Sequence, residues 1–184
     1  MRRFLMLTLL FPLCAGSVQV AAQALTPADR TFFDQHISQL VTIQPRLLTA
    51  PAVLKVFSAT FYDVTVAIHG SSGTETSKLI AARAGSRLLS VEPPGSDGSL
   101  PDVLALLNHS FTLATDADAR VLQQALDVVY PISSMDDTKA EAFSHTGHAW
   151  TFVRGSFFGK HAGFVFDTAP DGTITSVSYS LKLP

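Results

Sequence analysis

Hydrophobic residues recur at helical spacing in two pairs of segments, one near the beginning of the chain and one in its middle. In the first segment they follow one another every three or four positions, which indicates a helix with one buried face. Thr26 can cap this helix, and Pro45 marks its end. Thr115 can cap the last of the four helices in the same way. The predicted helices cover 26–44, 51–57, 99–107 and 115–130.

Each pair of predicted helices is followed by segments in which hydrophobic and polar residues alternate. Within 60–69 one face carries large apolar side chains and the other is partly polar, which is typical of a half-buried strand. Thr146-Gly147 is predicted as a two-residue hairpin turn between two of the later strands. The predicted strands cover 60–69, 77–83, 87–92, 142–145, 148–154, 162–167 and 173–181.

The resulting order, ααβββ followed by ααββββ, indicates an α+β protein. Strands joined by short turns favour antiparallel pairing, and helices grouped before strands argue against alternating α/β units. We therefore expect one continuous, curved antiparallel β-sheet packed against the helices. This element order resembles that of cystatin-like and inhibitor-type α+β sandwiches, a resemblance that carries no residue motif and assigns no family.

The repeated order of elements suggests two halves, 25–92 and 99–184, built as a duplicated helix-plus-meander unit. No residue motif is found to recur between them, so the repeat is one of element order. The Pro- and Gly-rich segment 93–98 is short enough to be a loop within one domain. We expect a single α+β domain that covers 25–184.

The first 24 residues have the pattern of a cleaved signal peptide. Arg2 and Arg3 precede an apolar run over 4–16, and small residues at 22 and 24 form a cleavage site before Leu25. The run is shorter than the roughly 20 residues that a helix needs to span a bilayer, so no stable membrane span is expected after cleavage. The single Cys of the chain is lost with this segment, and exported chains without disulfides are typical of bacteria. The sequence therefore predicts a bacterial periplasmic or secreted protein.

Composition excludes several classes of function. With 13 basic and 15 acidic residues the net charge is −2, which gives no electrostatic footprint for nucleic acid. Hydrophobic residues make up 47% of the chain and charged residues 15%, which excludes intrinsic disorder. The expected mature chain has no thiol, and no Gly-x-Ser-x-Gly motif is present. These observations favour a protein without catalytic activity.

One group of histidines is a candidate metal site. His145 and His148 flank the predicted Thr146-Gly147 turn, and facing residues of a hairpin lie close together. His161 on the neighbouring strand can supply a third ligand. Three histidines with an open fourth position are typical of catalytic zinc, so zinc is the cofactor that this group would take. The competing interpretation is that these are ordinary surface histidines and that the protein has no cofactor.

The aromatic C-terminal part holds the candidate binding residues. Phe157 and Phe158 lie in a glycine-flanked turn, and two adjacent strand residues point to opposite faces, so one ring is expected to be exposed. Arg154 and Lys160 flank the same turn and can bind an anion or a carboxylate, although the P-loop spacing is not met. Trp150 is the remaining candidate; core filling is the competing interpretation of these aromatics.

Three hypotheses of function follow. The leading one is a non-enzymatic exported binding protein whose partner is a protein or a small apolar ligand. The second is a small periplasmic metal-assisted hydrolase that uses the histidine group. The third is a docking component of an envelope assembly. The sequence leaves the ligand, the pocket and the oligomeric state open.

Overall fold

The computed structural model describes residues 26–34, 41–70, 73–91, 96–131, 143–157 and 160–183. The predicted signal peptide, residues 1–24, lies outside the described residues. Within the described part of the chain, every helix is too short or too polar to cross a membrane.

Four strands form an antiparallel sheet in the N-terminal half, with the order β1-β2-β3-β4. Five strands form a second antiparallel sheet, with the order β5-β9-β8-β7-β6. The strands are β1 (Val41–Leu47), β2 (Thr60–Gly70), β3 (Gly73–Ala84), β4 (Arg87–Val91), β5 (Gly98–Ser99), β6 (Phe143–Thr146), β7 (Ala149–Phe157), β8 (Lys160–Thr168) and β9 (Ile174–Ser180). The helices are α1 (Pro27–Asp34), α2 (Pro51–Val56), α3 (Pro101–Leu106) and α4 (Asp116–Val129).

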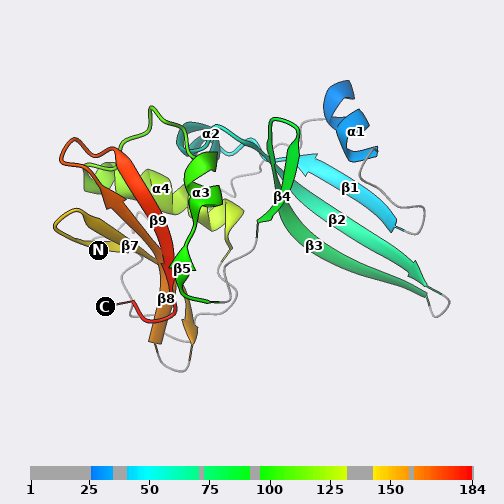
Figure 1. Cartoon of the computed structure of the whole chain (residues 1–184). Helices are drawn as coiled ribbons and strands as arrows, with labels where there is room; N and C mark the ends of the chain where they lie inside the picture. Colours follow the sequence, from blue (N-terminus) through cyan, green and yellow to red (C-terminus); the bar gives the residue numbers. More distant parts are fainter. Residues whose placement is uncertain are drawn as a thin grey trace, which may run out of the picture.

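The structure confirms the α+β class and the antiparallel pairing, but the strands form two sheets where one continuous sheet was expected. In Figure 1 the four-stranded sheet lies on one side of the molecule, and the five-stranded sheet lies on the other with α3 and α4. Tight turns pair strands within one half, so no described strand of one sheet pairs with a strand of the other. One cluster of buried hydrophobic side chains nevertheless includes residues from both sheets, such as Phe61 and Phe152.

Residues 41–47 form strand β1, where the hydrophobic spacing had predicted the end of a long helix. The described part of that helix, α1, ends at Asp34. Val41 and Ile43 are β-branched and favour extended backbone, and β1 pairs with β2 from Val41 through Leu47. Pro45 fits this strand because β1 is at the edge of its sheet, where a missing N–H breaks no ladder on the open side.

The C-terminal aromatic residues that the structure describes fill the core between α4 and the five-stranded sheet. Phe152, Phe164 and Phe166 are fully buried, and the rings of Phe152 and Phe166 meet edge to face at 5.4 Å. The buried residues of helix α4 lie on the face that packs against these phenylalanines. These residues are Ala119, Leu122, Ala125, Leu126 and Val129.

A short residue motif recurs between the halves, which corrects the expectation that none does. The pattern Pro-x-Val-Leu stands at 51–54 in α2 and at 101–104 in α3, fifty residues apart. Both helices are six residues long and begin with proline, whose fixed φ suits the first turn. That the halves arose by duplication stays a prediction.

The ends of α2 and α3 meet in the middle of the molecule. Phe57 and Leu107, the residues that follow the two helices, form an antiparallel β-bridge. Main-chain hydrogen bonds of 2.9 and 2.8 Å join residues 56–58 to residues 106–108, one in each direction. The reciprocal bonds relate the segments 56–58 and 106–108 by a local two-fold arrangement.

Candidate functional site

The turn between β6 and β7 is one residue later than predicted. Thr146 faces Ala149, so Gly147 and His148 form the turn, and Gly147 has a φ of +60° that suits glycine. His145 therefore faces Trp150 rather than His148, and their rings stack with centroids 4.4 Å apart.

The three candidate metal ligands are not gathered in one place. His161 faces Ser156 near one end of the β7–β8 hairpin, whereas the turn with His148 lies beside Asp167 at the other end. His161 and Asp167 are six positions apart on β8, a distance of about 20 Å at roughly 3.3 Å per residue. Among the described residues no group of three or more His, Cys, Asp or Glu side chains could hold a metal ion. The predicted three-histidine zinc site is therefore not assembled there.

Arg154 binds helix α4 and is not presented to solvent. Its side chain is completely buried, and Nη1 donates to Asp127 Oδ1 at 2.6 Å. Burial lowers the pKa of the guanidinium, and the hydrogen bond and charge of Asp127 oppose that shift. Arg154 is therefore explained as an anchor between the sheet and α4, with no open face for an anion.

The other predicted binding residues divide into two groups. Trp150 is 4% exposed and belongs to the core cluster. Phe158 lies outside the described residues, as do the side chains of Phe157 and Lys160, whose main chains belong to β7 and β8. An exposed phenylalanine at this turn stays a prediction.

The structure places a cavity beside α2, at the point where the chain enters β2, and its accessible lining is about as polar as it is apolar. It has a volume of about 640 Å³ and is called the α2 cavity below. Leu54 forms part of its wall and is 61% exposed, the more exposed of the two large hydrophobic side chains found at the described surface. The apolar side chains of the wall are Leu47, Leu48, Val53, Leu54, Phe57 and Phe61.

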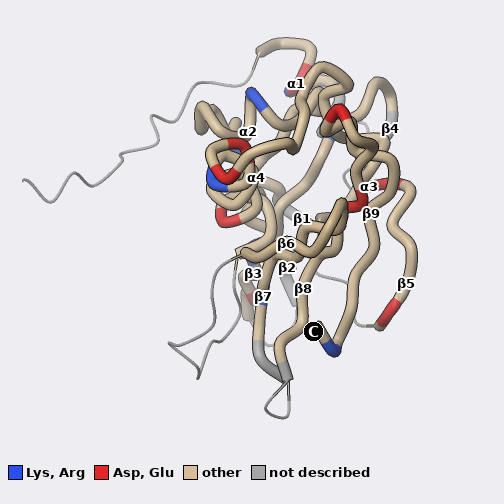
Figure 2. Tube along the Cα trace, turned by 90° about the vertical axis from the view of Figure 1, so that its left-hand side faces the viewer, with Lys and Arg blue, Asp and Glu red and all other residues tan. Residues whose placement is uncertain are grey.

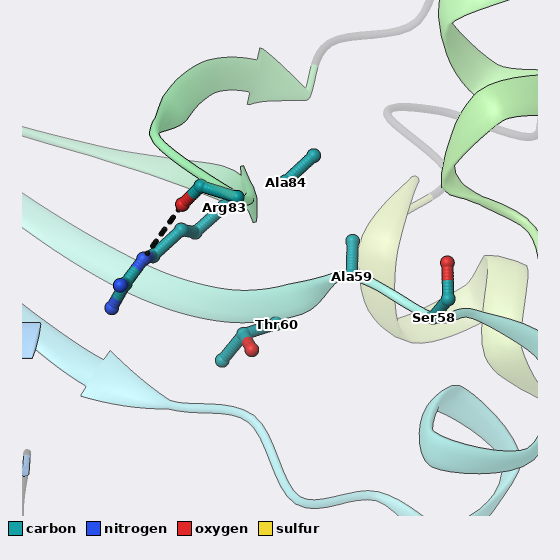
Figure 3. Close-up of a pocket in the computed structure, with 6 residues that line it drawn as sticks. Ser58, Ala59, Thr60, Arg83 and Ala84 are labelled. Atoms are coloured by element: carbon teal, nitrogen blue, oxygen red, sulfur yellow. Dashed lines mark hydrogen bonds between the residues drawn. The ribbon is translucent and has the colours of Figure 1, made fainter.

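A second, more polar cavity adjoins the first. It has a volume of about 440 Å³ and is called the Arg83 cavity; Ser58, Ala59 and Thr60 line both cavities. Figure 3 shows these three residues along the entry into β2, with Arg83 on the neighbouring strand β3. Arg83 Nε donates to the carbonyl oxygen of Gly85 at 3.1 Å, which fixes the base of this side chain.

The guanidinium of Arg83 is balanced by a carboxylate from α1. Arg83 Nη1 lies 2.5 Å from Asp29 Oδ1, and the Tyr62 hydroxyl donates to the same oxygen at 2.6 Å. Burial favours a higher pKa for Asp29, but hydrogen bonds from Tyr62 and Thr26 and the charge of Arg83 outweigh it, so the pKa lies below its usual value. Burial and the hydrogen bond to Asp29 raise the pKa of Tyr62 to about 12. This network attaches α1 to the four-stranded sheet.

Figure 2 shows Lys, Arg, Asp and Glu residues of the described chain at scattered places along the trace. We take the two cavities, whose linings share residues 58–60, as the candidate functional site.

Sequence reasoning did not find this site. Leu54 lies between Val53 and Val56 in a helix of six residues, and the sequence pattern does not show that the two valines are buried while Leu54 is exposed. One feature of the sequence could have indicated the site. Between the buried rings of Phe57 and Phe61 stand three residues with small side chains, Ser58-Ala59-Thr60, and small side chains leave room between large ones.

Comparison of the chain with family models, with curated proteins and with solved structures finds no significant match.

Proposed function

We propose that this chain is an exported, non-enzymatic binding protein that holds a small apolar ligand in the α2 cavity. The observation that carries the proposal is the exposure of Leu54 in the lining of that cavity, together with the apolar residues that lie beside it there. Ligand sites are typically hollows of about 300–1,000 Å³ lined mainly by hydrophobic side chains, and 640 Å³ lies within that range.

Burial of apolar surface supplies the driving force. A ligand in the cavity covers Leu54 and the accessible parts of its neighbours, and each Å² of apolar surface removed from water contributes about 25 cal/mol. Val53 and Phe57, 1% and 3% exposed, belong to the core and provide a fixed wall. A wall that is already ordered loses little conformational entropy when the ligand binds.

Export is the second part of the proposal, and the sequence pattern of residues 1–24 supports it. A basic start, a short apolar run and a small-residue cleavage site are the features of a secretory signal. On this basis the ligand is one that the protein meets in the periplasm or outside the cell.

The test is a titration of the purified protein with N-phenyl-1-naphthylamine, an uncharged probe whose fluorescence rises in apolar surroundings. We expect saturable binding of one probe per chain. Leu54→Asn should weaken binding about tenfold, because it replaces apolar wall by an amide that the ligand would have to desolvate.

Ile68→Asn is the matched control. Ile68 is 49% exposed on β2 and does not line the cavity, so this variant should bind the probe as the unchanged protein does. Absence of saturable binding, or equal loss in both variants, would contradict the proposal. Release of the probe by a co-purifying protein would favour the protein-partner hypothesis instead.

A further inference from the structure

The α2 cavity and the Arg83 cavity have residues 58–60 in common in their linings. Leu54 and Thr60 both line the α2 cavity, so a ligand with its apolar body beside Leu54 can reach Thr60 with its other end, at the border of the Arg83 cavity. The chemistry of the second cavity then determines what that end group is.

The shared wall offers hydrogen bonds to an end group. Thr60 is exposed and carries a hydroxyl, which can both donate and accept. Ser58 Oγ donates to the carbonyl oxygen of Leu106 at 3.2 Å, and its lone pairs can still accept. An apolar end group would cover these hydroxyls without replacing the hydrogen bonds that water makes to them.

The positive charge of Arg83 does not favour an anionic end group on the ligand. Asp29 already lies 2.5 Å from its guanidinium, so the pair is close to neutral as a unit. A carboxylate brought to this place would meet the negative charge of Asp29 as well as the positive charge of Arg83. In Figure 3 the guanidinium also points away from Ser58, along the sheet.

We infer that the ligand has an apolar body in the α2 cavity and an uncharged hydrogen-bonding end group, a hydroxyl or an amide, beside Thr60. This inference rests on the proposed function and specifies its ligand as an uncharged amphipathic molecule. It excludes fatty acids and other anionic lipids as the preferred class.

The experiment measures how well three eight-carbon compounds displace N-phenyl-1-naphthylamine from the protein: 1-octanol, octanoate and octane. 1-Octanol should displace the probe at about a tenfold lower concentration than either of the other two. Thr60→Val, which removes the hydroxyl and keeps the shape, should weaken 1-octanol severalfold and leave octane and the probe unchanged. Thr76→Val, in the exposed part of β3, is the matched control and should change nothing.

The outcomes separate this inference from the proposed function. Equal displacement by 1-octanol and octane, tighter binding of octanoate, or no effect of Thr60→Val would overturn the inference, while binding of the probe would leave the proposed function intact. If neither the probe nor any of the three compounds binds, both are overturned.

Discussion

Helices α2 and α3 share the pattern Pro-x-Val-Leu and are joined at their ends by one β-bridge, yet the leucine of that pattern has a different environment in each. Val53 and Val103 are 1% and 7% exposed, so the equivalent valines face the core in both helices. The leucines that follow them differ: Leu54 is 61% exposed, whereas Leu104 is partly buried against the core cluster.

The neighbours of the two helices explain the difference. Helix α3 contacts strand β9, while α2 packs against α4. No described strand covers α2 in the way that β9 covers α3, and the α2 cavity lies at that open side. One helix motif can therefore be packed into the core in one half and line an open cavity in the other.

The largest expected effect tests whether the bridge makes the two helices equivalent. Phe57→Ala and Leu107→Ala should each lower the free energy of unfolding by about 3–4 kcal/mol, because both side chains are almost fully buried between the halves. Urea unfolding measures both losses. A loss below about 1 kcal/mol at either position would show that the bridge is not part of the core.

The next effect concerns Arg154, which attaches the five-stranded sheet to α4. Asp127→Ala should lower the free energy of unfolding by about 2 kcal/mol, because it leaves the buried Arg154 charge without its partner. Arg154→Met removes the charge and keeps much of the volume, so it should cost less. Chemical denaturation of the two variants measures the difference, and a larger loss for Arg154→Met would contradict the anchor interpretation.

A smaller effect is expected when Leu54 and Leu104, the equivalent leucines of α2 and α3, are compared. Leu104→Asn should lower the free energy of unfolding by about 1–2 kcal/mol, whereas Leu54→Asn should stay within about 0.5 kcal/mol, because only Leu104 is partly covered. Thermal unfolding of the two variants side by side is sufficient. Equal losses would mean that Leu54 is covered in solution.

The smallest effect concerns the attachment of α1, and it depends on pH. Because the folded-state pKa of Asp29 lies below the unfolded value of about 3.9, its contribution is fully present above that value and is lost as the pH falls through the folded pKa. Asp29→Asn should therefore reduce the acid sensitivity of the protein below about pH 4. Urea midpoints across this range test it, and an identical acid profile in both proteins would refute the role of Asp29.

Local patterns allowed much of the fold to be predicted, and contacts distant in sequence limited the prediction. The alternation in 60–69 identified β2 because Tyr62 and Val64 are buried on one face of that strand, although Phe61 is buried on the opposite face as well. The helical spacing before Pro45 misassigned β1, whose extended form depends on pairing with β2.

The candidate site is a product of such distant contacts. It requires the end of α2, the entry into β2 and Arg83 on β3 to come together. The spacing of residues along the chain does not predict that these three segments are neighbours. Arg154 illustrates the same limit, since its partner Asp127 is 27 residues away. The turn between β6 and β7, by contrast, could be predicted from local sequence, and its observed position is one residue later than the predicted one.

The most direct test of the central claim is to map the binding place by the NMR signals of side-chain methyl groups during a titration with 1-octanol. The account predicts shifts for Leu47, Val53 and Leu54, with Leu104 and Ile68 unchanged. Shifts centred on Leu104 or Ile68, or no shifts at all, would contradict the claim that the open side of α2 is the binding site.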